Sequence, residues 1–157
     1  MCRLCWILTL LFATATGVLA WKFILQGETV PANDGRTAIL LTEGERDLVL
    51  SEMRAFLAAV QQVLDASVRG DVDAVASAAR AVGMATRAGV PDSLVGKLPL
   101  AFKKLGFATH EAFDRLALDT EALGDTREVP ETVAGIMRNC VACHASYRLK
   151  ARADAVR

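Results

Sequence analysis

The sequence has few cysteines and histidines and no excess of charge of either sign. Its 157 residues include four cysteines, two histidines, 18 basic and 18 acidic side chains. Without a basic excess the chain lacks the surface that neutralises phosphates, so we expect no nucleic-acid partner. A zinc site needs four ligands, and beyond residue 25 only two cysteines and two histidines remain. The sequence also shows no nucleophile–base arrangement, phosphate-binding loop or carboxylate pair, which argues against an enzyme.

The first 25 residues are almost entirely apolar. Arg3 and Lys22 are their only charged residues, which leaves 16 basic and 18 acidic residues beyond them, a net charge of −2. The apolar run from Leu4 to Ala20, with small residues near its end, is typical of an export signal. Apolar residues continue to Leu25, and a run of about 20 also suffices to span a bilayer. We therefore predict that residues 1–25 are a signal peptide or a membrane anchor attached through residues 4–25, and that the protein is periplasmic.

Beyond this segment the pattern predicts an all-α protein. Residues 26–40 contain two glycines, a proline, Asn33 and Asp34, and we expect them to be a linker. Apolar residues then recur at spacings of three and four, and no alternating strand pattern competes with them. Pro, Gly and Asp residues divide this region into four expected helices, at 42–68, 72–87, 99–123 and 130–147. Their short connections favour an antiparallel four-helix bundle over residues 41–157.

The last expected helix carries the sequence Cys140-Val-Ala-Cys143-His144. This CxxCH pattern is the signature of covalent haem attachment. Two thiols at this spacing can each add to one vinyl group of the same porphyrin, and the following imidazole can then bind the iron. A thioredoxin-like redox motif would need a βαβ context, which the sequence lacks. The other two cysteines, Cys2 and Cys5, lie in the apolar leader, and we assign them no role.

An export segment, four helices and the C-terminal Cys-Val-Ala-Cys-His-Ala-Ser-Tyr-Arg together resemble the class II c-type cytochromes, the cytochrome c-prime superfamily. The resemblance covers roughly residues 42–150 and implies one covalently bound haem c, held by Cys140 and Cys143, with His144 as the proximal iron ligand. It further implies either a low-spin electron carrier with a methionine ligand from the first helix, or a five-coordinate protein that binds nitric oxide or carbon monoxide. Some members are homodimers. The segment from Leu98 to His110 departs from the pattern of the family.

The residue opposite His144 decides between these two activities. Met53 lies on the apolar stripe of the first helix and is the first candidate for the distal ligand, although a methionine in such a stripe is often core filler. His110 is the second candidate, and a buried histidine that only bonds its neighbours is the alternative. A third arrangement leaves the distal site open, lined by Leu50 and Phe56.

The expected function is therefore one-electron transfer between redox partner proteins in the periplasm. The alternatives are a gas-binding protein and a haem subunit of a membrane oxidoreductase, which a retained anchor favours. Arg148, close behind His144, is either a contact for a haem propionate or a solvated charge.

Overall fold

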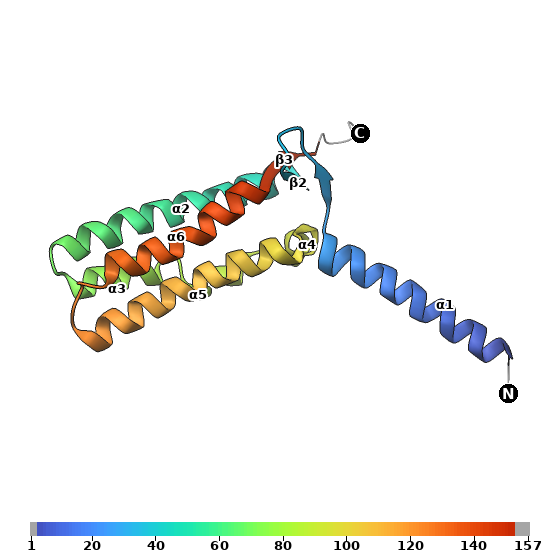
Figure 1. Ribbon diagram of the computed structural model, residues 1–157, viewed down its shortest axis with the longest axis horizontal. Helices are drawn as coiled ribbons and strands as arrows, with labels where there is room; N and C mark the ends of the chain where they lie inside the picture. The colour runs from blue at the N-terminus through green and yellow to red at the C-terminus, as the bar shows by residue number, and fades with distance from the viewer. Residues whose placement is uncertain (1–2, 153–157) are drawn as a thin grey trace.

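The computed structural model describes residues 3–152, so positions 1–2 of the expected leader and 153–157 of the expected domain lie outside it. The chain is mostly helical, with a small three-stranded sheet (Figure 1). In chain order the elements are α1 (Arg3–Ala20), the π-helix η1 (Trp21–Gln26), β1 (Thr29–Pro31), β2 (Thr37–Leu41), α2 (Glu43–Val68), α3 (Val72–Arg80), the 3₁₀ helix η2 (Met84–Gly89), α4 (Asp92–Lys97), α5 (Leu100–Leu123), α6 (Val129–Ser146) and β3 (Tyr147–Ala151).

The long helices begin and end at the residues that the sequence marks for those roles. Thr42 accepts a hydrogen bond from the Glu45 amide, and the Glu45 carboxylate accepts one from the Thr42 amide, which completes a capping box at the start of α2. Gly70 has a positive φ of 69° after α2, and the Asp71 side chain caps α3. These ends match the predicted ones to within one or two residues.

The second expected helix is shorter than predicted. It was expected to continue to residue 87, but α3 ends at Arg80 and a 3₁₀ helix follows. The cause is a side chain from α5, because the Asp114 carboxylate accepts a 2.8 Å hydrogen bond from the Met84 amide. That carboxylate occupies the space beside Gly83, where an added Cβ would lie 1.8 Å from an Asp114 oxygen. A continuous helix cannot accommodate this contact.

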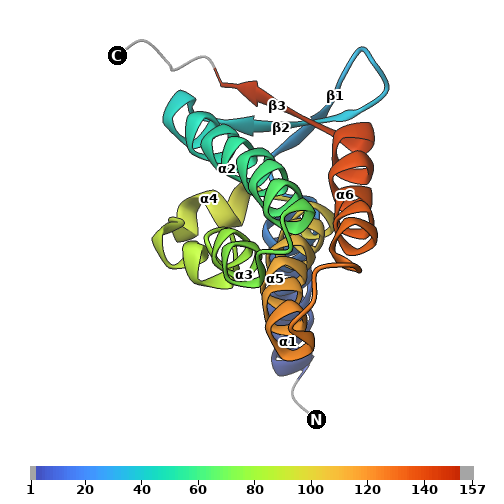
Figure 2. The same ribbon diagram turned by 90° about the vertical axis from the view of Figure 1, so that its left-hand side faces the viewer.

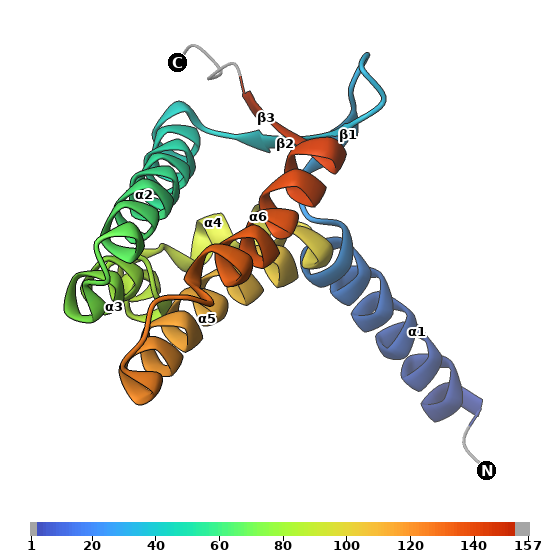
Figure 3. The ribbon, with the colours of Figure 1, turned by 60° about the vertical axis from the view of Figure 1, so that its left-hand side comes forward.

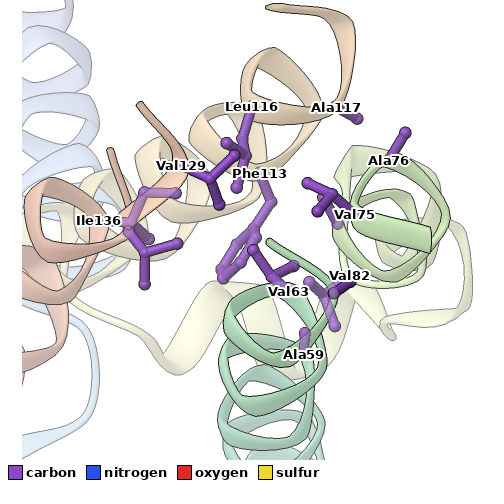
Figure 4. Close-up of a cluster of buried hydrophobic side chains, with 13 residues drawn as sticks. Ala59, Val63, Val75, Ala76, Val82, Phe113, Leu116, Ala117, Val129 and Ile136 are labelled. Atoms are coloured by element: carbon purple, nitrogen blue, oxygen red, sulfur yellow. The ribbon is translucent and has the colours of Figure 1, made fainter. Parts of the chain in front are cut away.

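Four helices, α2, α3, α5 and α6, pack around one apolar core (Figure 2). Phe113 of α5 lies at its centre, between Val63 of α2, Val75 of α3 and Ile136 of α6 (Figure 4). Phe113 is 1% exposed. On α6, Val129, Val133 and Ile136 are buried in this cluster, whereas Met137 and Val141 are exposed.

The segment expected to be a linker instead forms part of a sheet. β1 pairs antiparallel with β2, and β2 pairs in parallel with β3, which follows α6. Residues 32–36 form the tight turn between β1 and β2. Ala38, Ile39 and Leu41 of β2 are buried, and burial of this strand explains why 37–41 orders although no alternating pattern marks it.

The sheet covers a second apolar cluster at one end of the helices. Buried side chains from β2, α2, α4, the α4–α5 connection and α5 form it, namely Ile39, Leu41, Val49, Leu94, Leu98 and Phe102. Met53, Cys143, Tyr147 and Leu149 pack against its edge while remaining partly exposed. Figures 1 and 3 show the sheet at this end, opposite the α2–α3 and α5–α6 connections. The end of α6 that carries the CxxCH motif therefore lies beside this second apolar cluster.

The N-terminal helix projects away from the rest of the protein (Figures 1 and 3). Arg3–Gln26 is 24 residues long and apolar enough to cross a membrane, and its most apolar stretch is not buried at all. By length and composition it fits either a signal sequence or an anchor.

Candidate functional site

The CxxCH motif lies in the last two turns of α6. Cys140 and Cys143 are half-buried thiols that form no disulfide, and His144 is exposed. Cys140, Cys143 and His144 share one side of the helix because they are three and four residues apart. Burial, with a smaller contribution from neighbouring Cys140, raises the pKa of the Cys143 thiol to about 11, and burial also raises that of Cys140. Both side chains are therefore protonated thiols near neutral pH.

A pocket of about 270 Å³ opens beside this end of α6. It brings together three of the residues predicted from the sequence, since Cys143, His144 and Met53 all line it. Leu50, predicted as a distal wall, also lines it, one helical turn before Met53 on α2. The remaining lining residues are Arg36, Arg46, Phe102, Tyr147, Arg148 and Leu149. Cys140 lies one turn further from the pocket on the same helix.

Two arginines of the pocket share one carboxylate from the β1–β2 turn. Asp34 accepts hydrogen bonds from Arg36 Nε at 3.0 Å and Nη2 at 2.7 Å, and from Arg148 Nη1 at 3.3 Å. The hydrogen bonds from Arg36 hold the pKa of Asp34 at about 2, below its ordinary value of 3.8. Arg36 Nη1 also donates to the carbonyl oxygens of His144 at 3.2 Å and Tyr147 at 3.4 Å. The turn thereby fixes the end of α6 directly at the motif histidine.

The third arginine, Arg46, has a buried donor with no acceptor. Its Nε–H lies out of solvent and meets no hydrogen-bonding atom of residues 3–152. A buried donor left in this way is costly, by about 1–3 kcal/mol, and such groups in native proteins call for an explanation. Because Arg46 lines the pocket, an anionic ligand there would supply the acceptor.

Aromatic and apolar side chains close the inner wall of the pocket. The rings of Phe102 and Tyr147 meet edge to face, with centroids 5.5 Å apart. Leu149 of β3 stands in register with buried Ile39 of β2. The pocket thus has an apolar floor and a cationic rim, an arrangement suited to a largely apolar ligand with acidic groups at one edge.

His110 lies elsewhere in the protein. It is 4% exposed, its Nδ1 is 2.8 Å from the Val82 carbonyl, and its Nε2 is 3.1 Å from Glu52 Oε1. Burial lowers the pKa of His110, but its hydrogen bonds to Glu52 and Val82 outweigh this and leave the pKa raised. Both ring nitrogens are engaged, and the residue does not line the pocket. Phe56, predicted as distal lining, instead stacks on Phe113, with ring centroids 5.6 Å apart, and contacts the tilted ring of His110, with centroids 4.8 Å apart.

Several residues of the pocket were not predicted. Arg36 comes from the β1–β2 turn and Leu149 from β3, whereas Arg148, which was predicted as a possible propionate contact, lines the pocket from β3 and not from a helix. The signal was present, because Asn33-Asp34-Gly35 between Thr29-Val30 and the apolar run 37–41 is a typical hairpin sequence. Because we interpreted those residues as a linker, we did not predict the side of the pocket that the hairpin contributes.

Among residues 3–152, no three or more His, Cys, Asp or Glu side chains gather where they could hold a metal ion directly. No family model, curated protein or solved structure matches the chain.

Proposed function

We propose that this protein is a single-haem c-type cytochrome that transfers one electron at a time. One observation carries the proposal: the CxxCH motif opens onto a pocket that Met53 lines from the facing helix and that three arginines surround. In this assignment Cys140 and Cys143 form the two thioether bonds, and His144 is the proximal ligand. The helices α2, α3, α5 and α6 then constitute a haem-binding four-helix bundle of the kind that the sequence resembles.

The residues present fit the group. Haem is apolar except for two propionates, and the pocket combines an apolar wall with Arg36, Arg46 and Arg148 at its edge. The buried Nε–H of Arg46 gains an acceptor when a propionate lies against it. The two thiols are reduced, neutral and on one side of α6.

When bound, haem supplies a reversible one-electron couple at its iron. The chain's own residues set the conditions for that couple. Met53 offers a thioether sulfur, which favours the ferrous state, and Arg36 fixes the backbone of His144 through its carbonyl. Phe102, Tyr147 and Leu149 form an apolar wall on one side of the pocket. Nothing in this arrangement requires a chemical substrate, so electron exchange with partner proteins is the activity that it supports.

The apolar helix Arg3–Gln26 supports export of the protein. A c-type cytochrome with this leader belongs on the outer side of the cytoplasmic membrane, in the periplasm, where its partners are redox proteins. The sheet and its hairpin are additions to the bundle that the family resemblance did not imply.

The test is the optical spectrum of the reduced holoprotein with and without carbon monoxide. We expect a low-spin spectrum that carbon monoxide perturbs slowly, and we expect Met53→Ala to become high-spin and to bind carbon monoxide rapidly. Leu50→Ala, one turn away in the same pocket, is the matched control and should remain low-spin. If wild type binds carbon monoxide as fast as Met53→Ala does, the gas-binding function replaces the carrier function.

A further inference from the structure

The junction between the apolar helix and the rest of the protein is unusually tight. Gly27 follows η1 directly, is buried, and has a φ of 64°. An added Cβ at Gly27 would lie 2.3 Å from the Lys97 carbonyl oxygen and 2.8 Å from backbone atoms of Leu98 and Pro99. Its own amide donates to the Lys22 carbonyl at 2.9 Å. The end of the apolar helix is therefore pressed against the α4–α5 connection, where only glycine fits.

The next residue, Glu28, is hydrogen-bonded to the same connection and to two further parts of the protein. Its amide donates to the Lys97 carbonyl at 2.8 Å, and its carbonyl accepts from the Leu40 amide of β2, also at 2.8 Å. Its carboxylate accepts from Arg152 Nη1 at 3.1 Å, just beyond β3. Strand β1 begins at Thr29 and pairs at once with β2. No residue between the apolar helix and the sheet is free to act as a flexible linker.

The parts held by Gly27 and Glu28 are those that build the pocket. Lys97, Leu98 and Pro99 lead into the first turn of α5, which carries Phe102. Strand β3 carries Leu149, and its pairing with β2 places Leu149 opposite Ile39. Figures 1 and 3 show the apolar helix leaving from this end of the protein, beside the start of β1. Gly27 and Glu28 thus connect the apolar helix to the elements that form the pocket.

The length and flanks of the helix fit a span that stays in the membrane. Its 24 residues rise about 36 Å, against about 30 Å for a bilayer core. Trp6 lies near its outer end and Trp21-Lys22 near the protein, where aromatic and basic side chains favour the two interfaces.

We propose that Arg3–Gln26 is a retained membrane anchor and that Gly27 and Glu28 fix the haem pocket in one orientation at the bilayer surface. The haem part of this inference rests on the proposed function. The partner is the lipid bilayer itself, and the protein does not swing on a tether. Cleavage after Ala20 would remove α1, the helix whose orientation Gly27 and Glu28 fix.

The test uses the full-length holoprotein in vesicles that are stacked into aligned multilayers. The electron paramagnetic resonance of the oxidised haem should change strongly as the layers are rotated in the field. A ten-residue Gly-Ser insertion between Gln26 and Gly27 should abolish this angular dependence while the solution spectrum stays unchanged. The same insertion between Gly124 and Asp125, in the exposed α5–α6 turn, is the control and should preserve it.

A wild-type signal that is independent of angle overturns the proposal, and so does a mature N-terminus at Trp21. Circular dichroism of the same aligned layers reads helix orientation without haem. One outcome separates the two proposals. If the protein carries no covalent haem, but its helices are aligned in wild type and lose alignment in the Gly-Ser insertion variant, the rigid connection at Gly27 and Glu28 is supported and the proposed function is wrong. If haem is present and neither readout shows alignment, the proposed function stands and the joint fails.

Discussion

Replacing His110 by leucine tests whether this buried histidine is a structural residue. The change removes the hydrogen bond to the Val82 carbonyl and the contact with Glu52 Oε1, at 2.8 and 3.1 Å. A buried carbonyl left without its donor costs about 1–3 kcal/mol, and a hydrogen bond to a charged group contributes about 1.5–3 kcal/mol. Because Glu52 is 37% exposed, solvent screens part of the second contribution. We expect a loss of about 2–4 kcal/mol in the free energy of unfolding.

The pH dependence of that loss identifies its cause. The pKa of His110 is raised in the folded state, so its charged form stabilises the protein fully below the unfolded value of about 6.5. This contribution decreases as the pH rises from there through the folded pKa. The difference between wild type and His110→Leu in urea unfolding should therefore shrink with increasing pH. Glu52→Gln should remove most of the same pH dependence.

Two results would refute this reasoning. A difference that is constant from pH 5 to pH 9 would show that the imidazole carries no stabilising charge. A conversion of the haem spectrum to high spin in His110→Leu, with the fold intact, would show that His110 binds the iron and that the pocket has been placed wrongly.

Three further changes follow from the packing and the charges. Gly83→Ala should cost about 1–3 kcal/mol in urea unfolding, because its Cβ displaces the carboxylate that caps η2, whereas Gly96→Ala, with open space around it, should be neutral or slightly stabilising. Phe113→Ala should cost about 3–5 kcal/mol, against less than about 1 kcal/mol for Leu118→Ala at a 60% exposed position; equal losses would contradict the core assignment. Asp34 stabilises the fold above pH 3.8, and this contribution is lost as the pH falls towards 2, so acid unfolding of Asp34→Asn should lack that part of the wild-type pH dependence.

The helices could be predicted from the sequence because their signals are local. Thr42 with Glu45, Gly70 with Asp71, and Pro99 each fix a helix end through contacts within a few residues. The CxxCH motif is local in the same sense, since its spacing alone places both thiols and the imidazole on one side of α6.

The β1–β2 hairpin has a local signal that we interpreted as a linker, whereas the third strand could not be found in this way because β3 is distant from β2 in the chain. The pairing of β2 with β3 depends on a strand that follows the motif, and burial of Ile39 is visible only once α2, α4 and α5 are in place. The same holds for the early end of α3, which a carboxylate from α5 imposes. His110 and Met53 illustrate how far the site can be predicted from the sequence. Both lie on apolar helix faces, and only the packing shows that Met53 lines the pocket.

The pairing of β2 with β3 also has a consequence for the order in which the protein matures. Arg36 and Tyr147 lie 111 residues apart, so the contacts between the β1–β2 turn and the end of α6 close a very long loop. Loops of that length close slowly, after local helices have formed. Under the proposed function, we expect the new chain to pass through a stage in which α6 is helical while Cys140 and Cys143 are still open to haem attachment. The pairing of β3 with β2 would follow, and it would bring Arg148 and Leu149 to the pocket.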